Sequence, residues 1–340
     1  MMKTINSHVA GYIAGLMSEK EWSEIQELAI IGPVNNADLQ FINTSTSVKH
    51  LDLHEANTLT ELTAVSFYGN NDIETISLSS KINHIAKDCF EGCGKLKNIH
   101  ISEQNSYYKS VDGILYSKEG FELIKCGAGR EGELRIEKGT KIIDELAING
   151  CDKLESILIP EGVETIEERG ITLCDGISVL KLPSTLKKIS SLSIRCCKNL
   201  KTIEVTPGNS KLTSTGSSLL SKEQRYNRNH TVLVKVAEAT EGDYETPQDV
   251  TFIDAQAFDG CEKITNFLIS KNVKECDELM FYGTKSAVSV RCFGDTAPEC
   301  HRSYIRHKSL PVNYLYVPKG KYQVYHKAPY WNGFLFNIEM

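Results

Sequence analysis

A phrase of 23 residues recurs along the chain, and this period constrains the fold more than any other feature. Its clearest run places Ile136, Ile159, Leu182 and Val205 at equal intervals. A fixed period of this size predicts a solenoid, because a single coil cannot bury its apolar side and must stack on its neighbours. Other positions of the phrase keep the same interval: Ile143, Ile166 and Ile189; Ile148, Ile171 and Ile194; Leu154, Ile177 and Leu200.

Within one coil the residues indicate a short strand, a turn and a compact return. Ile157 and Ile159 are two residues apart, the spacing of side chains that share one face of a strand. The segment 160–162, Pro-Glu-Gly, reads as a turn. The segment 148–151 is too short for a helix, so we expect a tight helical or irregular turn there.

One slot of the phrase holds cysteine in five coils: Cys93, Cys151, Cys174, Cys197 and Cys261. Neighbouring slots would lie about 4.8 Å apart, within the range for disulfides. Stacked identical side chains point the same way, however, which disfavours the disulfide dihedral angle. We therefore expect Cys151, Cys174 and Cys197 to be buried, reduced thiols that pack as small apolar groups. The slot also tolerates other residues, since Asn70 and Thr284 occupy it elsewhere.

Two segments that resemble each other, residues 102–135 and 206–245, break the period. The first contains Asp112-Gly113 and Glu119-Gly120, turn signals between alternating apolar residues that are typical of β-hairpins. The second continues into an expected strand at 231–236. We expect each insert to be a modified coil carrying a β-hairpin that projects from the stack, and expect the fold to survive removal of the second.

The two ends differ from the repeats, as the caps of a solenoid do. Residues 9–28 are expected to be helical, with a capping box at Ser18 and Glu21. Strands are expected at 28–31 and 51–53 and again at 314–317, and a short helix at 321–327. The aromatic residues near the C-terminus are suited to covering the last coil.

The repeated phrase resembles the BspA-like leucine-rich repeats. Its first half, Leu-x2-Ile-x-Ile-Pro-x2-Val-x2-Ile, stands at 154–166, and its second half, Phe-x-Gly-Cys-x2-Leu, stands at 90–96. The insert phrase at 108–117 and the closing pattern from Ala297-Pro298 to Tyr330-Trp331 are also similar to that family. The resemblance covers nearly the whole chain and rests on repetition in register.

The resemblance implies an α/β repeat protein, a right-handed leucine-rich-repeat solenoid with a parallel β-sheet on one face, β-hairpin inserts and capped ends. We divide the chain into an N-terminal cap (1–54), the solenoid (55–296) and a C-terminal cap (297–340). The family also implies a bacterial cell-surface or secreted protein that adheres to or binds other proteins, and it is not enzymatic. The start of the chain lacks a clear signal peptide, which leaves a cytoplasmic location open.

Composition excludes several other classes. The formal net charge of −6 comes from interspersed signs, not from the basic face of a nucleic-acid binder. No run approaches the roughly 20 apolar residues of a membrane-spanning helix. The motifs of nucleophilic, metalloprotease and phosphate-binding sites do not occur, so we expect no enzyme, no catalytic residues and no cofactor.

Two places offer candidate metal ligands. Cys292, Cys300, His301 and His307 are four potential ligands near one another, but without the paired spacing of structural zinc sites. Cys89 and Cys93 have that spacing, yet only Cys93 lies in the repeat slot, so the two are expected to face different ways. We therefore expect no metal site.

Binding to a protein partner, such as a host extracellular-matrix or envelope protein, is the function that this pattern favours. Tyr and Arg are common anchors of interfaces, and both inserts contain them. The alternatives are that the aromatic side chains pack back on the solenoid, that the protein binds carbohydrate, or that it is a cytoplasmic scaffold. The candidate partner-binding residues are Tyr107, Tyr108, Tyr116, Phe121, Arg225, Tyr226 and Arg228.

Overall fold

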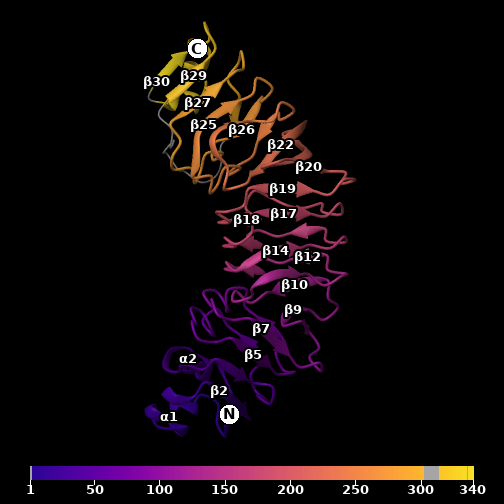
Figure 1. The fold of residues 1–340 in the computed structure, drawn as a ribbon, viewed down its shortest axis with the longest axis vertical. Coiled ribbons are helices and arrows are strands. Elements are labelled where there is room, and N and C mark those ends of the chain that lie inside the picture. The colour runs from indigo at the N-terminus through magenta and orange to yellow at the C-terminus, as the bar shows by residue number, and fades with distance from the viewer. Residues whose placement is uncertain (1, 302–313, 335) are drawn as a thin grey trace. The chain divides into compact units, whose positions relative to one another are not determined.

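A computed structural model describes residues 2–301, 314–334 and 336–340 of the chain (Figure 1). The chain forms two compact units, Met1–Gly176 and Ile177–Met340. Both are built from stacked coils joined by parallel strands, which confirms the predicted leucine-rich-repeat solenoid. Strands of neighbouring coils pair at the repeat interval, as where Ile76 lies opposite Ile99.

The first unit carries one set of parallel strands, each of three to five residues, that pair at the repeat interval. Five of them form one parallel sheet in the order β1-β2-β3-β5-β7, and two more, β11 and β14, pair further along. Their inward residues, such as Leu28, Leu51 and Ile76, enter a continuous apolar core. The bounds are β1 (Lys3–Asn6), β2 (Glu27–Ile31), β3 (His50–Asp52), β5 (Thr75–Leu78), β7 (Asn98–Ile101), β11 (Gly132–Arg135) and β14 (Leu154–Leu158).

Several coils also carry shorter strands that the sequence did not reveal. The isoleucines at 143 and 166 lie in a second parallel ladder, and those at 148 and 171 lie in a third, where a turn was expected. The β-branched side chains at these repeat positions suit paired strands, although each strand is only two residues long. These strands are β4 (Glu61–Leu62), β6 (His84–Ile85), β12 (Ile142–Ile143), β13 (Ile148–Asn149), β15 (Thr165–Ile166) and β16 (Ile171–Thr172).

The N-terminal cap is only partly helical. Residues 9–28 contain a 3-10 turn, η1 (Ile13–Leu16), and one short helix, α1 (Glu19–Glu24), before β2 begins. The capping box of Ser18 and Glu21 is confirmed, and it starts a new helix instead of continuing an earlier one. A second helix, α2 (Asn36–Ser45), was not predicted; Asn35 caps it in the same way. Since β1, β2 and β3 belong to the repeat sheet, the cap extends that sheet.

The first insert forms a hairpin that is part of the stack. Strands β8 (Tyr108–Val111) and β9 (Ile114–Ser117) pair antiparallel, and β10 (Glu122–Lys125) pairs antiparallel with β9 and parallel with β12. The hairpin turn also contacts the repeat sheet, because the backbone N–H of Ile99 donates to the carbonyl of Gly113 at 2.9 Å. The modified coil is confirmed, because β10 supplies the short strand of its own coil. The expectation that the hairpin projects from the stack was wrong, because its turn is hydrogen-bonded to the repeat sheet.

The second unit repeats this plan. Its longer strands include the pair β17 (Val179–Leu182) and β19 (Thr202–Val205), and the five-stranded sheet β23-β25-β27-β29-β30. A six-stranded sheet, β20-β21-β22-β24-β26-β28, contains the second insert. The remaining bounds are β18 (Ile194–Arg195), β20 (Leu212–Thr215), β21 (Ser218–Arg225), β22 (Arg228–Val236), β23 (Glu241–Glu245), β24 (Phe252–Ile253), β25 (Lys263–Ile269), β26 (Glu275–Asp277), β27 (Ser289–Cys292), β28 (Glu299–His301), β29 (Tyr314–Val317) and β30 (Phe336–Glu339).

The second insert is also integral to the fold. Strand β22 contains the predicted strand 231–236 and pairs parallel with β24, and its Leu233 and Val236 enter the apolar core of the unit. Removing residues 206–245 would therefore remove core strands, so the structure predicts that the fold would not survive this deletion, contrary to the expectation from the sequence. The inserts share details: Asn105 and Asn209 each accept two backbone N–H groups through the side-chain oxygen.

The two inserts differ in length at one place. Two residues, Glu119 and Gly120, separate Lys118 from Phe121 in the first, whereas eight residues, 223–230, separate Lys222 from Thr231 in the second. The longer connection extends β21 and β22 into an antiparallel pair that turns at Tyr226 and Asn227. The second insert thus carries an additional strand tip that the first one lacks.

At the C-terminus, the expected strand 314–317 is confirmed as β29 and the short helix as α3 (Tyr322–Lys327), followed by a 3-10 turn, η2 (Trp331–Gly333). Tyr325 and Trp331 are fully buried, and the Trp331 indole N–H donates to the carbonyl of Pro298 at 2.8 Å. The aromatic residues therefore cover the end of the core, as predicted. Among the described residues, no helix is long and apolar enough to cross a membrane.

Candidate functional site

The first insert presents two of its four candidate aromatic side chains to solvent. Tyr107 and Phe121 are 56% and 54% exposed, and Tyr108 is half-buried. Tyr116 has no exposed surface, and its hydroxyl accepts the backbone N–H of Glu137 at 3.1 Å. Assigning Tyr116 to a partner surface was therefore wrong, because its position on β9 directs the ring into the stack.

Hydrogen bonds hold the backbone around both exposed rings. The N–H of Tyr107 donates to the Asn105 side chain at 2.8 Å, and its carbonyl accepts from Lys118 at 2.8 Å. The carbonyl of Phe121 accepts from Lys141 at 2.7 Å and from Ile142 at 3.0 Å. The two side chains are thus exposed from a main chain that has little freedom to move.

The second insert brings its three candidate residues together at the tip of β21 and β22. Tyr226 and Asn227 both have positive φ, 48° and 63°, as the two central residues of a tight hairpin turn require. This conformation suits Asn but is uncommon for a bulky residue such as Tyr. The Tyr226 ring stacks on the imidazole of His301, with 3.7 Å between ring centroids. The stacking provides a tertiary contact that holds this unusual turn, while Tyr226 itself stays 56% exposed.

The arginines of the tip form ion pairs with the sheet beneath it. Arg225 donates to both carboxylate oxygens of Asp254, at 2.8 and 3.1 Å. Burial raises the pKa of Asp254, and Arg225 opposes that shift. Arg228 donates to Glu275 at 2.6 Å although its own side chain is 64% exposed. The tip therefore contacts the sheet through these two arginines, whereas the alternative interpretation concerned the aromatic side chains.

Glu275 is a deeply buried acidic group beneath the tip, with a side chain only 2% exposed. Its carboxylate accepts hydrogen bonds from Arg228 and from the His301 imidazole Nε2, the latter at 2.8 Å. Burial by itself would raise the pKa of Glu275. The hydrogen bonds from Arg228 and His301 and the nearby positive charges together lower it by a larger amount, so the pKa lies below its usual value. Sequence reasoning missed Glu275, since a lone glutamate in a strand has no distinguishing pattern.

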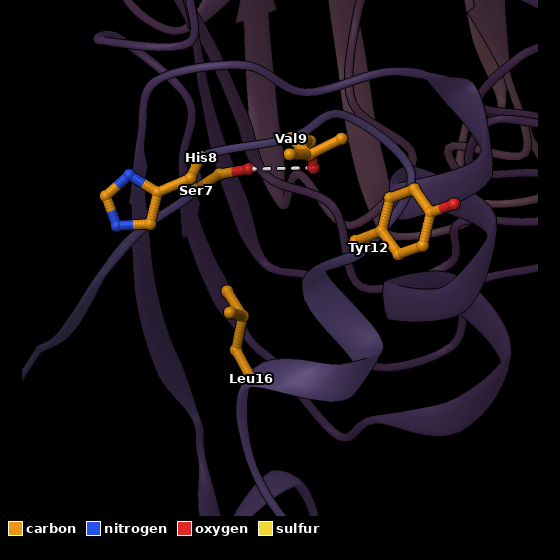
Figure 2. A pocket seen from close by; sticks show the side chains of 5 residues that line it. All are labelled: Ser7, His8, Val9, Tyr12 and Leu16. Atoms are coloured by element: carbon orange, nitrogen blue, oxygen red, sulfur yellow. Dashed lines mark hydrogen bonds between the residues drawn. The ribbon is translucent and has the colours of Figure 1, made fainter.

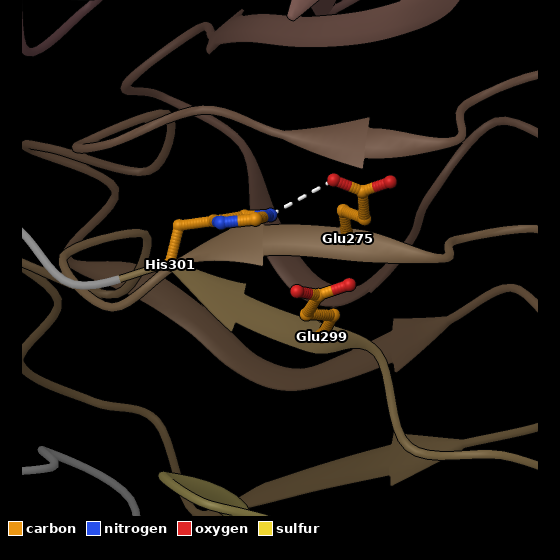
Figure 3. Close-up of side chains that lie close together, drawn as sticks. All are labelled: Glu275, Glu299 and His301. Atoms are coloured by element: carbon orange, nitrogen blue, oxygen red, sulfur yellow. Dashed lines mark hydrogen bonds and ion pairs between the residues drawn. The ribbon is translucent and has the colours of Figure 1, made fainter. Parts of the chain in front are cut away.

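The candidate metal ligands are placed differently from the expectation. Cys89 and Cys93 both point into the core of the first unit, so the expectation that they face different ways was wrong. Cys300 packs against the core of the second unit, while its neighbour His301 turns to the other face of β28 and meets Glu275 and Glu299 (Figure 3). His307 lies outside the described residues.

Two buried lysines occupy equivalent places in the two inserts, and the sequence analysis missed both. Lys125 on β10 donates to the carbonyl of Leu146 at 2.8 Å, and Lys235 on β22 donates to the carbonyl of Asp259 at 2.6 Å. Burial lowers the pKa of Lys125, and the cysteines around it oppose that shift. The sequence does contain a sign of this equivalence: Leu-Ile-Lys at 123–125 in the first insert corresponds to Leu-Val-Lys at 233–235 in the second.

An apolar pocket of about 440 Å³ lies at the N-terminal end of the first unit. Figure 2 shows its lining side chains on the loop after β1 and on η1. Val9 and Tyr12 are 57% and 70% exposed, which is unusual for apolar groups gathered in one place. No repeat pattern marks this pocket, because it lies in the cap. The lining residues are Ser7, His8, Val9, Tyr12 and Leu16.

Comparison with known proteins gives a consistent result. Six copies of the BspA type leucine rich repeat region match residues 25–111, 131–229 and 242–297. The fold is similar to that of a leucine-rich cell surface protein from Faecalibacterium prausnitzii, with a TM-score of 0.51 and 15% identity, covering 91% of this chain and 83% of that one. A leucine-rich repeat protein from Eubacterium ventriosum has a TM-score of 0.47 and 15% identity, covering 86% and 66%. No curated protein sequence matches this one.

The matched segments include well over half of the chain, and they contain both the coils and parts of the two inserts. Stacked parallel strands, a repeated apolar core and the recurring cysteine slot are the features that these repeats produce here. The chain belongs to the BspA type leucine-rich repeat family.

Proposed function

We propose that this protein is a non-catalytic protein-binding module of a bacterial cell surface, in which the inserts supply the contact residues. The observation that carries the proposal is the exposure of three large aromatic side chains, Tyr107, Phe121 and Tyr226, on strands and turns that are otherwise hydrogen-bonded. Aromatic side chains supply much of the binding energy of protein interfaces. A rigid main chain adds to this, because little conformational entropy is lost when it binds.

Membership of the BspA type leucine-rich repeat family also supports a protein-binding function. Repeat solenoids of this kind build extended surfaces, and a similar fold occurs in a protein described as a leucine-rich cell surface protein. Adhesion to a host extracellular-matrix protein or to an envelope protein is the finer form of the proposal. Carbohydrate binding is its rival, since exposed aromatic rings also stack on sugars.

The test compares binding of the intact protein and of surface variants to purified matrix proteins, envelope proteins and a glycan array. The double variant Tyr107→Ser, Phe121→Ser should lose at least about tenfold in affinity for the protein partner, the effect of removing interface anchors. Tyr68→Ser is the matched control, because Tyr68 is equally exposed, at 57%, but lies outside the inserts.

Unchanged affinity of the double variant would remove the first insert from the proposal, and the single variant Tyr226→Ser then tests the second. Binding to glycans alone would replace the protein-binding function with the carbohydrate-binding one. Equal losses in the double variant and in Tyr68→Ser would show that the aromatic side chains act without regard to place, which contradicts a defined surface.

A further inference from the structure

The tip of the second insert covers one face of the sheet strands β24, β26 and β28. Along these strands, Phe252 lies opposite Glu275 and Glu275 lies opposite Glu299. Their sequence neighbours Ile253 and Cys276 point into the apolar core, so Glu275 and Glu299 are on the face away from it. His301 is two residues after Glu299 and shares that face.

Three metal-ligating groups converge on this face. One ligand atom from each of Glu275, Glu299 and His301 lies within 4.8 Å of the others, and Figure 3 shows the imidazole and the two carboxylates gathered around a common space. Carboxylate oxygens and imidazole nitrogens bind Zn²⁺ at about 2.0–2.2 Å. The Glu299 side chain is 61% exposed, so it is free to move the small distance needed to close a coordination sphere.

A fourth group, His230 of β22, approaches one of these ligands, Glu275, from the insert, although its ring nitrogens are not within 4.8 Å of all three. Its side chain is 4% exposed, and its Nε2 lies 3.6 Å from a Glu275 oxygen, beyond hydrogen-bond distance. Among the described residues this buried Nε2 has no hydrogen-bond partner. Its Nδ1 lies 3.1 Å from the Thr251 hydroxyl, and a proton on Nδ1 leaves the Nε2 lone pair directed at Glu275. Such an outer hydrogen bond is the usual support of a metal-binding imidazole.

Arg228 supplies the positive charge beside Glu275 and Glu299. Its Nη1 lies 2.6 Å from Glu275 and 3.7 Å from Glu299. The guanidinium is mostly exposed at the tip and can turn into solvent without breaking the core. A divalent cation bound by the two carboxylates would displace it, and its charge would balance theirs.

We propose that His230, Glu275, Glu299 and His301 form a binding site for a divalent transition-metal cation, with Zn²⁺ the best match to two imidazoles and two carboxylates. The buried His230 Nε2, which has no hydrogen-bond partner in the described part of the chain, distinguishes this cluster from an ordinary surface ion pair. His230, Arg228 and Tyr226 all belong to the longer connection of the second insert, which the first insert lacks. The site would tie this added tip, which includes Tyr226, to the sheet, and it is inferred independently of the proposed protein binding.

The test titrates the full chain, stripped of metal and kept reduced, with Zn²⁺ in competition with a chromophoric chelator. One equivalent should bind tightly, and Glu275→Gln, His230→Ala and His301→Ala should each weaken binding at least about tenfold, as loss of a ligand does. Arg228→Ala should strengthen binding, because it removes the competing cation. Cys300→Ser is the matched control and should leave the affinity unchanged, since Cys300 packs against the core.

Co²⁺ then reports the ligand type. Nitrogen and oxygen ligands give visible d–d bands without the near-ultraviolet charge-transfer band of a thiolate. The absence of a bound equivalent, a thiolate band, or equal affinity in the protein and in Glu275→Gln would each overturn the proposal. If a histidine variant fails to fold, the gain expected for Arg228→Ala still decides the matter, because that side chain is at the exposed tip.

Discussion

At the residue scale, the cysteine slot links each coil to the one before it. The thiol of Cys93 lies 3.0 Å from the carbonyl of Phe67, and that of Cys174 lies 3.7 Å from the carbonyl of Ile148. Cys151 and Cys261 make similar contacts with carbonyls of the preceding coil. All of these side chains are buried, as predicted for the ladder. A small side chain with one weak donor therefore fits the slot better than a purely apolar group.

The same geometry explains why other residues are tolerated in the slot. The Asn70 side-chain oxygen accepts the backbone N–H groups of Asp72 and Ile73, at 2.9 and 2.7 Å. The Thr284 hydroxyl donates to the carbonyl of Phe281 at 2.9 Å. Each substitute is small and satisfies a nearby backbone group, which a buried turn requires.

Cys174→Ala should lower the free energy of unfolding by about 1–3 kcal/mol, because it leaves a small cavity and removes the thiol contacts. Urea denaturation measures this loss as a lower midpoint at unchanged slope. Cys196→Ala is the control: its half-buried side chain lies next to the ladder, and the expected change is within about 0.5 kcal/mol. Equal effects of both substitutions would show that the slot has no special role.

At the scale of elements, some side chains of each insert complete the core of the stack and others face solvent. Tyr116 on β9 and Leu123 on β10 enter the stack, while Tyr107 and Phe121 remain outside it. The inserts therefore complete the coils in which they occur and also expose aromatic groups. The second insert adds the strand tip with Tyr226, and this tip returns to the sheet through ion pairs.

Two substitutions in the first insert should separate these purposes. Tyr116→Ala should cost about 3–5 kcal/mol, since it empties a fully buried aromatic position and leaves the Glu137 N–H without its acceptor. Tyr107→Ala should change stability by less than about 0.5 kcal/mol because its ring is in solvent. Thermal or urea unfolding of the two variants gives the comparison, and a large cost at Tyr107 would contradict the described burial.

At the scale of the whole molecule, many thiols and phenols are buried within the stacked coils. Burial raises the pKa of Cys93 to about 11, of Cys261 to about 12 and of Tyr116 to about 12. The unfolded chain releases these protons near their ordinary values, so above pH 9 it binds fewer protons than the folded protein does. The free energy of unfolding must then fall as the pH rises.

Alkaline pH should therefore destabilise the protein from about pH 9 upward. A buried thiol such as Cys93, with its pKa raised to about 11, contributes a loss on the order of 2–3 kcal/mol by pH 11, because a tenfold change in an acid dissociation constant corresponds to about 1.4 kcal/mol. Lys125, whose pKa burial lowers, acts in the opposite direction but is a single group. Urea midpoints measured from pH 7 to 11 check the trend, and Cys93→Asn should flatten it. A stability that does not fall above pH 9 would contradict the burial of the thiols.

Much of this architecture was predictable, because the residues that form the apolar core of a repeat protein recur in the sequence at a fixed interval. The period alone places Ile143 and Ile166 in register, and the pattern of Cys93 and its equivalents indicates burial. The N-terminal cap was harder to predict: helical spacing over residues 9–28 suggested one helix, yet Ser18 caps a separate short one. Caps lack the repetition that averages out such local ambiguities.

The sequence by itself determined the coil, its period, its family and the location of the two inserts, since each of these depends on residues close together in the chain. Only the tertiary structure decided what the inserts do. Tyr116 and Tyr107 are the same residue type, and the sequence does not separate them. The pairing of β9 with β10 buries Tyr116, whereas Tyr107 stays in solvent. Likewise His230, Glu275 and His301 are far apart in sequence, and they meet because β22, β24, β26 and β28 lie side by side in one sheet. Contacts between neighbouring coils create such sites, and a one-dimensional pattern does not specify which outward side chains they bring together.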